Sequence, residues 1–366
     1  MVIVEFMVTE KCNLACTYCY MANKKSFMTV DTVDKFFETI GDFMKLYNED
    51  QYHISYFGGE PTLNWDIIEY SLPKFKADPR CHSYNMISNG LELNEERVKW
   101  MKENNLGISL SFDGLWNDVS RPMATGHASF EKYREKKDLL KSLTNGCKVM
   151  VHPNNFKTMT ENYVFFVEEY GFPNPDFSLV RDDIYTEEDL KIFNVEIKRL
   201  ADKMIEYNKA GRRTTNGLFL LYTLDTIIGK KYGKRKFGCF AGTHGAGFTP
   251  DGKYFPCARF ASGKDYELMD ANTKEINYEN VNLLKQPKMT DPREFEECQG
   301  CSLYNYCNAG CTFSQLKNGN QERAKPIDSV CKLLKMCYRE SGRIMKELKD
   351  NETYKYAINS SLNNIG

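Results

Sequence analysis

The sequence has no apolar run long enough to cross a membrane, no export signal and almost no net charge. Its 366 residues carry 49 basic and 50 acidic side chains, a formal net charge of −1. A membrane-spanning helix needs about 20 consecutive apolar residues, and the first ten residues are too acidic for a signal peptide. A near-neutral chain also has no overall field that would attract nucleic acid or an anionic membrane. These absences predict a cytoplasmic protein with neither a nucleic-acid nor a membrane partner.

Cysteine is the residue type in excess. The chain has 13 cysteines, an odd number. Because a reducing cytosol disfavours disulfides, close cysteine spacings there indicate metal binding or catalysis. Ten cysteines fall into two groups, one in the first twenty residues and one between residues 239 and 331. We expect the other three to be small buried apolar side chains; they are Cys81, Cys147 and Cys337.

Strand and helix patterns alternate through the first half of the chain. The predicted strands span residues 2–8, 52–57, 84–88, 107–112, 148–152 and 177–180. The predicted helices span residues 29–48, 63–76, 94–103, 129–143, 161–170 and 187–209. This alternation predicts an α/β fold with parallel strands and right-handed crossovers. Six units predict a partial (β/α)6 TIM-like barrel, with the chemistry at the C-terminal ends of the strands.

The pattern changes after about residue 210, where glycine and cysteine become frequent. We predict a barrel domain over residues 1–214 and a small cysteine-rich domain over residues 215–350, ending in a helix at 327–347. The second domain would be organised by metal rather than by a large apolar core. Residues 351–366 read as a weak helix or a frayed tail.

Three cysteines occur within eight residues, as Cys12-x3-Cys16-x2-Cys19 after the first predicted strand. Zinc sites usually have a fourth Cys or His ligand, and the nearest histidine downstream is His53. Three thiolates and an unfilled fourth position suit a [4Fe–4S] cluster with one open iron. The segment resembles the Cys-x3-Cys-x-aromatic-Cys signature of radical S-adenosylmethionine (SAM) enzymes, and Tyr18 holds the position associated with the adenine. A structural zinc loop is the alternative interpretation.

Motifs at later strand ends resemble the SAM pocket of that family. Gly58-Gly59-Glu60 follows the second predicted strand, and the resemblance implies that its backbone and carboxylate hold the methionyl ammonium. Taken alone, this motif indicates only a turn. The resemblance also implies SAM contacts by Ser88, Asn89, Ser111, Arg121 and Leu179. A guanidinium suits the SAM carboxylate; without the resemblance, these residues are strand-end turns, a surface charge or, for Leu179, core.

Seven cysteines in the second half have the spacing of the SPASM domain, which follows a radical SAM core. They are Cys239, Cys257, Cys298, Cys301, Cys307, Cys311 and Cys331. The resemblance implies two auxiliary [4Fe–4S] clusters, hence three clusters and SAM as cofactors. It assigns Cys239, Cys257 and Cys311 to the first auxiliary cluster, and Cys298, Cys301, Cys307 and Cys331 to the second. Two structural zinc sites are the alternative.

The first auxiliary cluster would then have three cysteine ligands. Some family members have a fourth cysteine six residues after the first, and here that position is Gly245. Either another residue completes the cluster, or one iron is open and binds a substrate thiolate.

The resemblance implies a peptide- or protein-modifying oxidoreductase and leaves several reactions open. An open iron favours a thioether cross-link in a ribosomally made, cysteine-containing peptide. The first alternative is an anaerobic sulfatase maturase, which forms formylglycine; its deprotonating aspartate would follow the second SPASM cysteine, where this chain has Ala258. Carbon–carbon or ether cross-linking and epimerisation are further alternatives. The last alternative is a non-catalytic metal-binding scaffold. It is disfavoured because such a scaffold would have no use for the motifs that resemble a SAM pocket.

The resemblance also implies partners. A flavodoxin- or ferredoxin-type reductant would supply electrons. The barrel is expected to begin at about residue 3, so peptide recognition would need a separate leader-binding protein or another surface. The basic stretch from Gly229 to Lys236 is a candidate for an acidic peptide, although a solvated loop is the simpler interpretation.

Overall fold

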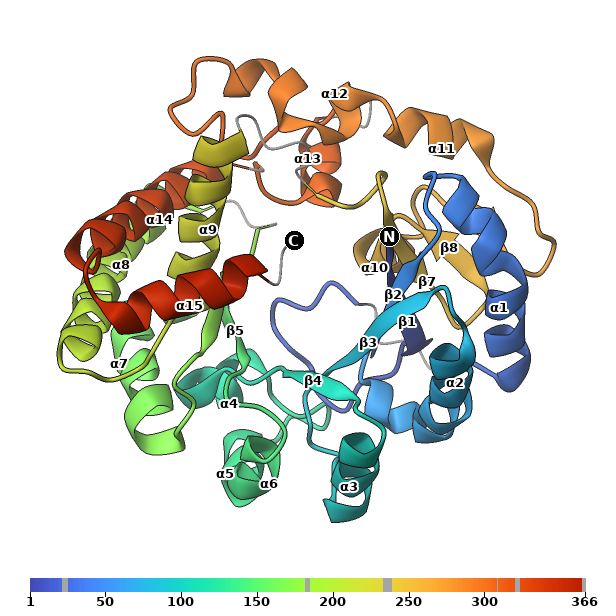
Figure 1. Ribbon diagram of the computed structural model, residues 1–366, viewed down its shortest axis with the longest axis horizontal. Coiled ribbons are helices and arrows are strands. Elements are labelled where there is room, and N and C mark those ends of the chain that lie inside the picture. Colours follow the sequence, from blue (N-terminus) through green and yellow to red (C-terminus); the bar gives the residue numbers. More distant parts are fainter. Residues whose placement is uncertain (22–25, 182–184, 233–238, 308, 320–322, 364–366) are drawn as a thin grey trace. The chain divides into compact units, whose positions relative to one another are not determined.

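The computed structural model of the protein (Figure 1) describes all residues except 22–25, 182–184, 233–238, 308, 320–322 and 364–366. The chain forms two compact units. The first contains residues 1–111, 117–144 and 239–290. The second contains residues 112–116, 145–238 and 291–366. The predicted boundaries at 214 and 350 stay predictions.

A seven-stranded mixed sheet forms the centre of the first unit, in the order β4-β3-β2-β1-β7-β8-β9. The strands are β1 (Val2–Thr9), β2 (Tyr52–Gly58), β3 (Cys81–Ser88), β4 (Gly107–Leu110), β7 (Gly245–Phe248), β8 (Lys253–Phe255) and β9 (Met269–Asp270). Strands β1 to β4 are parallel, and β7 adds a fifth parallel strand on the other edge of β1. Strands β8 and β9 continue the sheet antiparallel.

Helices α1 (Val30–Lys45) and α2 (Trp65–Ala77) cover one face of this sheet (Figure 1). Alternation along β1 sends Val4 and Phe6 to the covered face and Glu5 to the other. The Phe6 ring stacks on Phe248 of β7 at 5.6 Å and meets Phe36 of α1 edge-on at 5.1 Å. The core of this unit therefore lies between the sheet and these helices, and the opposite face carries polar side chains.

Other helices of the first unit are short, apart from α3. They are α3 (Glu95–Glu103), α4 (Asn117–Ser120), α5 (Phe130–Glu135), α6 (Lys137–Lys141), α10 (Ala258–Gly263), α11 (Tyr278–Leu284) and α12 (Pro287–Thr290). The single helix predicted over residues 129–143 is divided at Lys136 into α5 and α6.

The second unit has one parallel strand pair and longer helices. Strands β5 (Lys148–Val151) and β6 (Asp176–Leu179) pair in register. The helices are α7 (Met159–Val164), α8 (Glu187–Lys209), α9 (Gly217–Tyr232), α13 (Thr312–Asn318), α14 (Asp328–Glu347) and α15 (Glu352–Asn363). Helix α8 begins with a capping box in which Thr186 and Asp189 each accept the other's backbone N–H. Helices α8 and α14 are amphipathic and bury their apolar sides.

All six predicted strands are present, but they do not form one continuous ladder among the described residues. The six fall into two sheets, with β1 to β4 in one and β5–β6 in the other. Beyond β4, the Phe112 N–H donates to the Lys148 carbonyl at 3.1 Å. The Asp113 carboxylate then accepts the Met150 N–H at 2.8 Å, where a strand carbonyl would otherwise pair. The α/β fold is confirmed, and the six-unit partial barrel stays a prediction.

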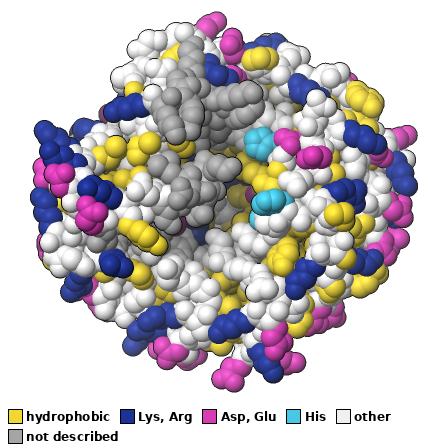
Figure 2. All heavy atoms as spheres, viewed as in Figure 1, with side chains coloured by type: hydrophobic (Ala, Val, Ile, Leu, Met, Phe, Trp, Pro, Cys, Tyr) yellow, Lys and Arg dark blue, Asp and Glu magenta, His cyan; other side chains and the backbone are white. Residues whose placement is uncertain are grey.

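Two surface observations complete the description. Basic and acidic side chains are interspersed over the visible face of the molecule (Figure 2), in keeping with their nearly equal numbers. Within the described residues, no helix combines the length and apolarity needed to cross a membrane.

Candidate functional site

The loop that carries Cys12, Cys16 and Cys19 is held by backbone hydrogen bonds to the end of α4 and to the segment that follows it. The Ala15 N–H donates to the Pro122 carbonyl at 2.8 Å, and the Thr17 N–H donates to the Ser120 carbonyl at 2.9 Å. Cys19 is exposed, and the other two cysteines are half-buried. The loop therefore keeps a defined shape while its thiols remain accessible.

The Gly58-Gly59 turn packs directly against the chain that leads into this loop. The Gly59 N–H donates to the Thr9 carbonyl at 2.9 Å, and the Glu60 N–H donates to the Lys11 carbonyl at 2.8 Å. A Cβ on Gly58 would lie 2.0 Å from the Thr9 oxygen, and its φ is +141°. Glycine is required here because the two backbones touch. The structure thus brings the glycine motif to the cysteine loop.

Glu60 is buried, and its carboxylate connects two strand ends. Oε1 accepts hydrogen bonds from the Thr62 N–H at 3.1 Å and the Ser88 hydroxyl at 2.7 Å. Oε2 accepts the Asn89 N–H at 2.8 Å. Burial raises the pKa of the Glu60 carboxyl, and these hydrogen bonds partly offset that rise. Because both oxygens are engaged within the protein, the geometry favours the motif's backbone over this carboxylate for holding an ammonium group.

Arg121 lies beside the cysteine loop. Its Nη1 is 3.9 Å from the Cys16 sulfur, and its guanidinium lies 5.3 Å from the centre of the Tyr18 ring. The side chain is largely buried. A guanidinium is suited by its shape and charge to bind a carboxylate, and this one lies beside the Cys16 thiol.

The remaining predicted SAM contacts lie in different units of the chain. Ser88 and Asn89 lie at the end of β3, next to Glu60, and the Asn89 side-chain amide donates to Asn13 Oδ1 at 2.7 Å. Ser111 follows β4, and its N–H donates to the Ser88 carbonyl at 2.8 Å. Leu179 is buried at the end of β6 in the second unit. The first unit therefore contains the other predicted SAM contacts, and the contact predicted for Leu179 stays a prediction.

Two polar residues of this region were not predicted. Asn13 links the cysteine loop to Asn89, as just described. Glu5 is a half-buried carboxylate on β1 whose Oε2 accepts the Ala258 N–H at 2.6 Å. The signal for Glu5 was present in the sequence, because it is the one charged residue in the apolar run from Val2 to Val8.

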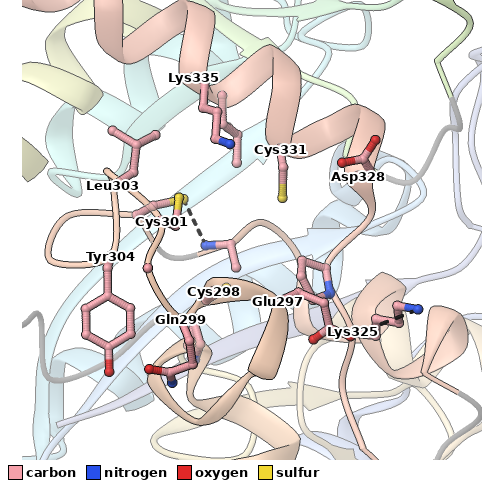
Figure 3. Close-up of a pocket in the computed structure, with 16 residues that line it drawn as sticks. Glu297, Cys298, Gln299, Cys301, Leu303, Tyr304, Lys325, Asp328, Cys331 and Lys335 are labelled. Atoms are coloured by element: carbon pink, nitrogen blue, oxygen red, sulfur yellow. Dashed lines mark hydrogen bonds and ion pairs between the residues drawn. The ribbon is translucent and has the colours of Figure 1, made fainter.

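Four of the later cysteines line one cavity of about 320 Å³ in the second unit. They are Cys298, Cys301, Cys307 and Cys331, the set predicted for the second auxiliary cluster. Cys331 extends from α14 toward the space that Cys298 and Cys301 line (Figure 3). Cys311 does not line this cavity. The cavity leaves room for a group larger than a single ion.

Burial at this cavity favours the neutral form of the cysteine thiols. Burial raises the pKa of the Cys307 thiol to about 12 and that of Cys298 to about 11. Metal binding must therefore displace protons from these thiols. Among the described residues, no three Cys, His, Asp or Glu side chains converge as ligands of one metal ion.

Cys239 and Cys257 belong to the first unit, and Cys311 belongs to the second. Cys257 directly precedes α10. At Gly245, a Cβ would lie 2.4 Å from the Phe240 ring and 2.9 Å from the Pro256 carbonyl. A cysteine does not fit at that position of the backbone, which accounts for its absence there.

Comparison with known proteins identifies the class. Residues 6–161 match the model of the Radical SAM superfamily. The chain therefore carries a radical SAM domain over these residues.

Three relatives with named functions are similar to this chain over most of its length. The radical SAM cyclopropyl synthase TigE of Paramaledivibacter caminithermalis is 21% identical, over 84% of this chain and 67% of its own length. A cysteine-type anaerobic sulfatase-maturating enzyme of Clostridium perfringens is 24% identical, over 88% of this chain and 91% of its own length. The antilisterial bacteriocin subtilosin biosynthesis protein AlbA of Bacillus subtilis is 24% identical, over 89% of this chain and 70% of its own length.

Solved structures agree on the fold. The structure of native anSMEcpe with bound AdoMet superposes with a TM-score of 0.75 at 20% identity, covering 96% of this chain and 100% of that one. The structure of anSMEcpe with bound AdoMet and the Cp18Cys peptide gives 0.73 at 19% identity, covering 95% of this chain and 99% of that one. At these identities the likeness concerns the fold alone.

Proposed function

We propose that this radical SAM enzyme modifies a peptide or protein and carries three [4Fe–4S] clusters. The observation that carries the proposal is the cavity lined by four cysteines, in a chain whose radical SAM domain has its own three-cysteine loop. Cys12, Cys16 and Cys19 would hold the SAM-cleaving cluster. Cys298, Cys301, Cys307 and Cys331 would hold the second auxiliary cluster, and a SPASM-type domain would contain both auxiliary sites.

The SAM pocket would be built from the strand ends of the first unit. The Gly58-Gly59 backbone would face the methionyl ammonium, and Arg121 would pair with the SAM carboxylate. Tyr18, Ser88, Asn89 and Ser111 would complete the pocket, with Glu60 holding two of its segments together. When bound, the N-terminal cluster supplies the electron that cleaves SAM into a hydrogen-abstracting radical.

A thioether cross-link in a cysteine-containing peptide is the reaction we place first. Cys239, Cys257 and Cys311 would be the protein ligands of the first auxiliary cluster, and the crowding at Gly245 excludes a fourth cysteine there. An iron left open can bind a substrate thiolate, the ligand such clusters prefer. The relatives support a peptide or protein substrate, since one is a bacteriocin biosynthesis protein and one structure holds a peptide.

Sulfatase maturation is the second candidate. The sulfatase-maturating relative from Clostridium perfringens aligns over 91% of its own length. The residue after Cys257 is Ala258, which cannot accept a proton, and its N–H is already donated to Glu5. Carbon–carbon bond formation is supported in the same way by the cyclopropyl synthase relative. The reductant, any leader-binding protein and the cytoplasmic location remain predictions from the sequence. The basic stretch from Gly229 to Lys236 remains a candidate for binding an acidic peptide, and its residues from 233 onward lie outside the described residues.

Two measurements test the class and the reaction. Anaerobically reconstituted enzyme should hold roughly twelve irons per chain and form 5′-deoxyadenosine from SAM under reduction, whereas Cys16→Ala should abolish that cleavage. A colourless zinc protein would refute the proposal. The Cp18Cys peptide and any short cysteine-rich peptide encoded beside this gene are then the probes. Loss of two hydrogens, together with a cysteine that iodoacetamide no longer alkylates after reduction, indicates a thioether, and loss of the sulfur indicates formylglycine.

A further inference from the structure

Helix α10 begins directly after Cys257 and lies on the polar face of the sheet. Its first N–H, on Ala258, donates to the Glu5 carboxylate at 2.6 Å. Glu5 is on β1, and β1 runs into the loop that carries Cys12, Cys16 and Cys19. One hydrogen bond therefore joins the segment of a predicted auxiliary ligand to the strand that leads to the SAM-cleaving loop.

Gly247 makes this contact sterically feasible. It lies on β7 directly opposite Glu5 in the ladder. A Cβ on Gly247 would lie 2.6 Å from the Cys257 carbonyl carbon and 2.8 Å from the Ala258 nitrogen. Both distances are shorter than any ordinary Cβ contact, so the Cys257–Ala258 peptide can rest on the sheet only because residue 247 has no side chain.

Two further contacts tie α10 to the cysteine loop itself. The Arg259 guanidinium lies 4.3 Å from the centre of the Tyr20 ring, and Tyr20 follows Cys19 in sequence. The Ser262 hydroxyl donates to the Tyr20 carbonyl at 2.7 Å. Three residues of one helical segment thus contact β1 or the end of the loop, and all of them belong to the first unit.

We propose that α10 holds Cys257 at a fixed position relative to the Cys12–Cys19 loop, and that Glu5 is the positioning residue that seats it. The inference rests on the proposed function, in which both segments bind clusters. A fixed separation would keep the SAM-cleaving cluster and the first auxiliary cluster within a constant electron-transfer distance. Glu5 acts through Cys257, and it needs no contact with substrate for this role.

Two substitutions at Glu5 distinguish the effect of the hydrogen bond to the Ala258 N–H from the effect of the carboxylate charge. Glu5→Ala removes the acceptor of the Ala258 N–H, whereas Glu5→Gln keeps an acceptor oxygen of nearly the same reach. Glu131→Ala is the matched control, because Glu131 is an exposed glutamate on α5 of the same unit. Ser262→Ala removes the hydrogen bond from α10 to the Tyr20 carbonyl and leaves Glu5 on the sheet unchanged. It is the second test variant if Glu5→Ala does not fold. Full-length, reconstituted enzyme is used throughout, and circular dichroism confirms folding.

The readouts are iron content and the electron paramagnetic resonance spectrum of the reduced enzyme. Cys257→Ala defines the loss expected without the first auxiliary cluster, roughly four of twelve irons. We expect Glu5→Ala to lose or alter that same signal while the signal of the N-terminal cluster stays. Glu5→Gln should restore it, Ser262→Ala should broaden it, and Glu131→Ala should match wild type.

Two results overturn the inference, and they are distinguishable. If Cys257→Ala removes the auxiliary signal but folded Glu5→Ala and Ser262→Ala match wild type, α10 does not position the ligand and the proposed function stands. If Cys257→Ala itself leaves iron content and spectrum unchanged, the first auxiliary cluster is refuted and the inference falls with it.

Discussion

A buried carboxylate is tolerated only when hydrogen bonds replace its lost hydration, and Glu60 meets that condition. Thr62 donates to it through both its N–H and its hydroxyl, and Ser88 and the Asn89 N–H donate from the end of β3. These donors come from the ends of two strands. At the scale of the residue, Glu60 therefore determines the shape of the region predicted to hold SAM.

Glu60→Ala should lower the free energy of unfolding by about 3 kcal/mol, because several hydrogen-bond donors lose their acceptor inside the protein. Urea denaturation followed by circular dichroism measures the change. Glu131→Ala, at an exposed glutamate, should change it by less than about 0.5 kcal/mol. Equal effects of the two substitutions would contradict the structural role given to Glu60.

Cys307 should react slowly with iodoacetamide in the metal-free protein. Burial raises the pKa of its thiol to about 12, and only the thiolate is nucleophilic. Below that pKa the thiolate fraction rises tenfold per pH unit, so at pH 8 the rate should be about a thousandfold below that of free cysteine. The rate should keep rising up to pH 10, where free cysteine has levelled off. Alkylation followed by peptide mass spectrometry measures it, and a plateau near pH 9 would show an ordinary pKa.

Cysteine spacing and glycine pairs were informative in the sequence because metal ligands and backbone contacts each require a specific residue type. The Gly58-Gly59 turn and the cavity cysteines were recognisable for that reason. Glu5 and Asn13 were missed, because their partners, Ala258 and Asn89, are distant in sequence. Only the folded sheet brings such pairs together.

At the scale of the element, periodicity predicted the long segments well. Strands β1 to β6 and helices α1, α2, α3, α8 and α14 lie close to their predicted positions. Strands β8 and β9 were missed, since three and two residues are too few to display alternation. Strand β7 was missed because two of its four residues are glycines, which are depleted in strands. The apolar helix α9 was missed as well, because its buried residues do not follow a clear helical stripe.

Strand β7 offers a test of the cysteine pattern. Gly245→Cys would supply the fourth ligand found in some relatives of this type, yet its Cβ would collide with the Phe240 ring. We expect a lower melting temperature and no gain in iron content. Gly107→Cys is the matched control, because no atom lies within 4 Å of a Cβ there. A stable Gly245→Cys variant with an altered auxiliary cluster spectrum would mean that the strand rearranges to accept the ligand.

At the scale of the whole molecule, the order of the first sheet decides what can fold alone. Strand β1 lies between β2 and β7, and β7 begins at residue 245. A fragment of residues 1–214, the barrel domain predicted from the sequence, lacks β7 and leaves one edge of an apolar strand unpaired. Exposed apolar edges promote association.

We therefore expect the 1–214 fragment to aggregate when expressed alone, and the full chain to remain monodisperse at the same concentration. Size-exclusion chromatography with light scattering measures both. A fragment of residues 1–290 restores β7 to β9 but, like 1–214, lacks α14. A difference in aggregation between the two fragments therefore measures the effect of the open β1 edge. A monodisperse, folded 1–214 fragment would show that the edge of β1 is protected by other means.

The place of β1 also has a consequence for synthesis on the ribosome. The first strand to leave the exit tunnel is an inner strand of its sheet, and its second neighbour is made more than two hundred residues later. At about 5–20 residues per second in translation, the nascent chain waits on the order of ten seconds or more with that edge open. The cysteine loop next to β1 emerges early in the same interval. The first sheet therefore cannot be completed until residues 245–248 have been made, and one edge of β1 stays open until then.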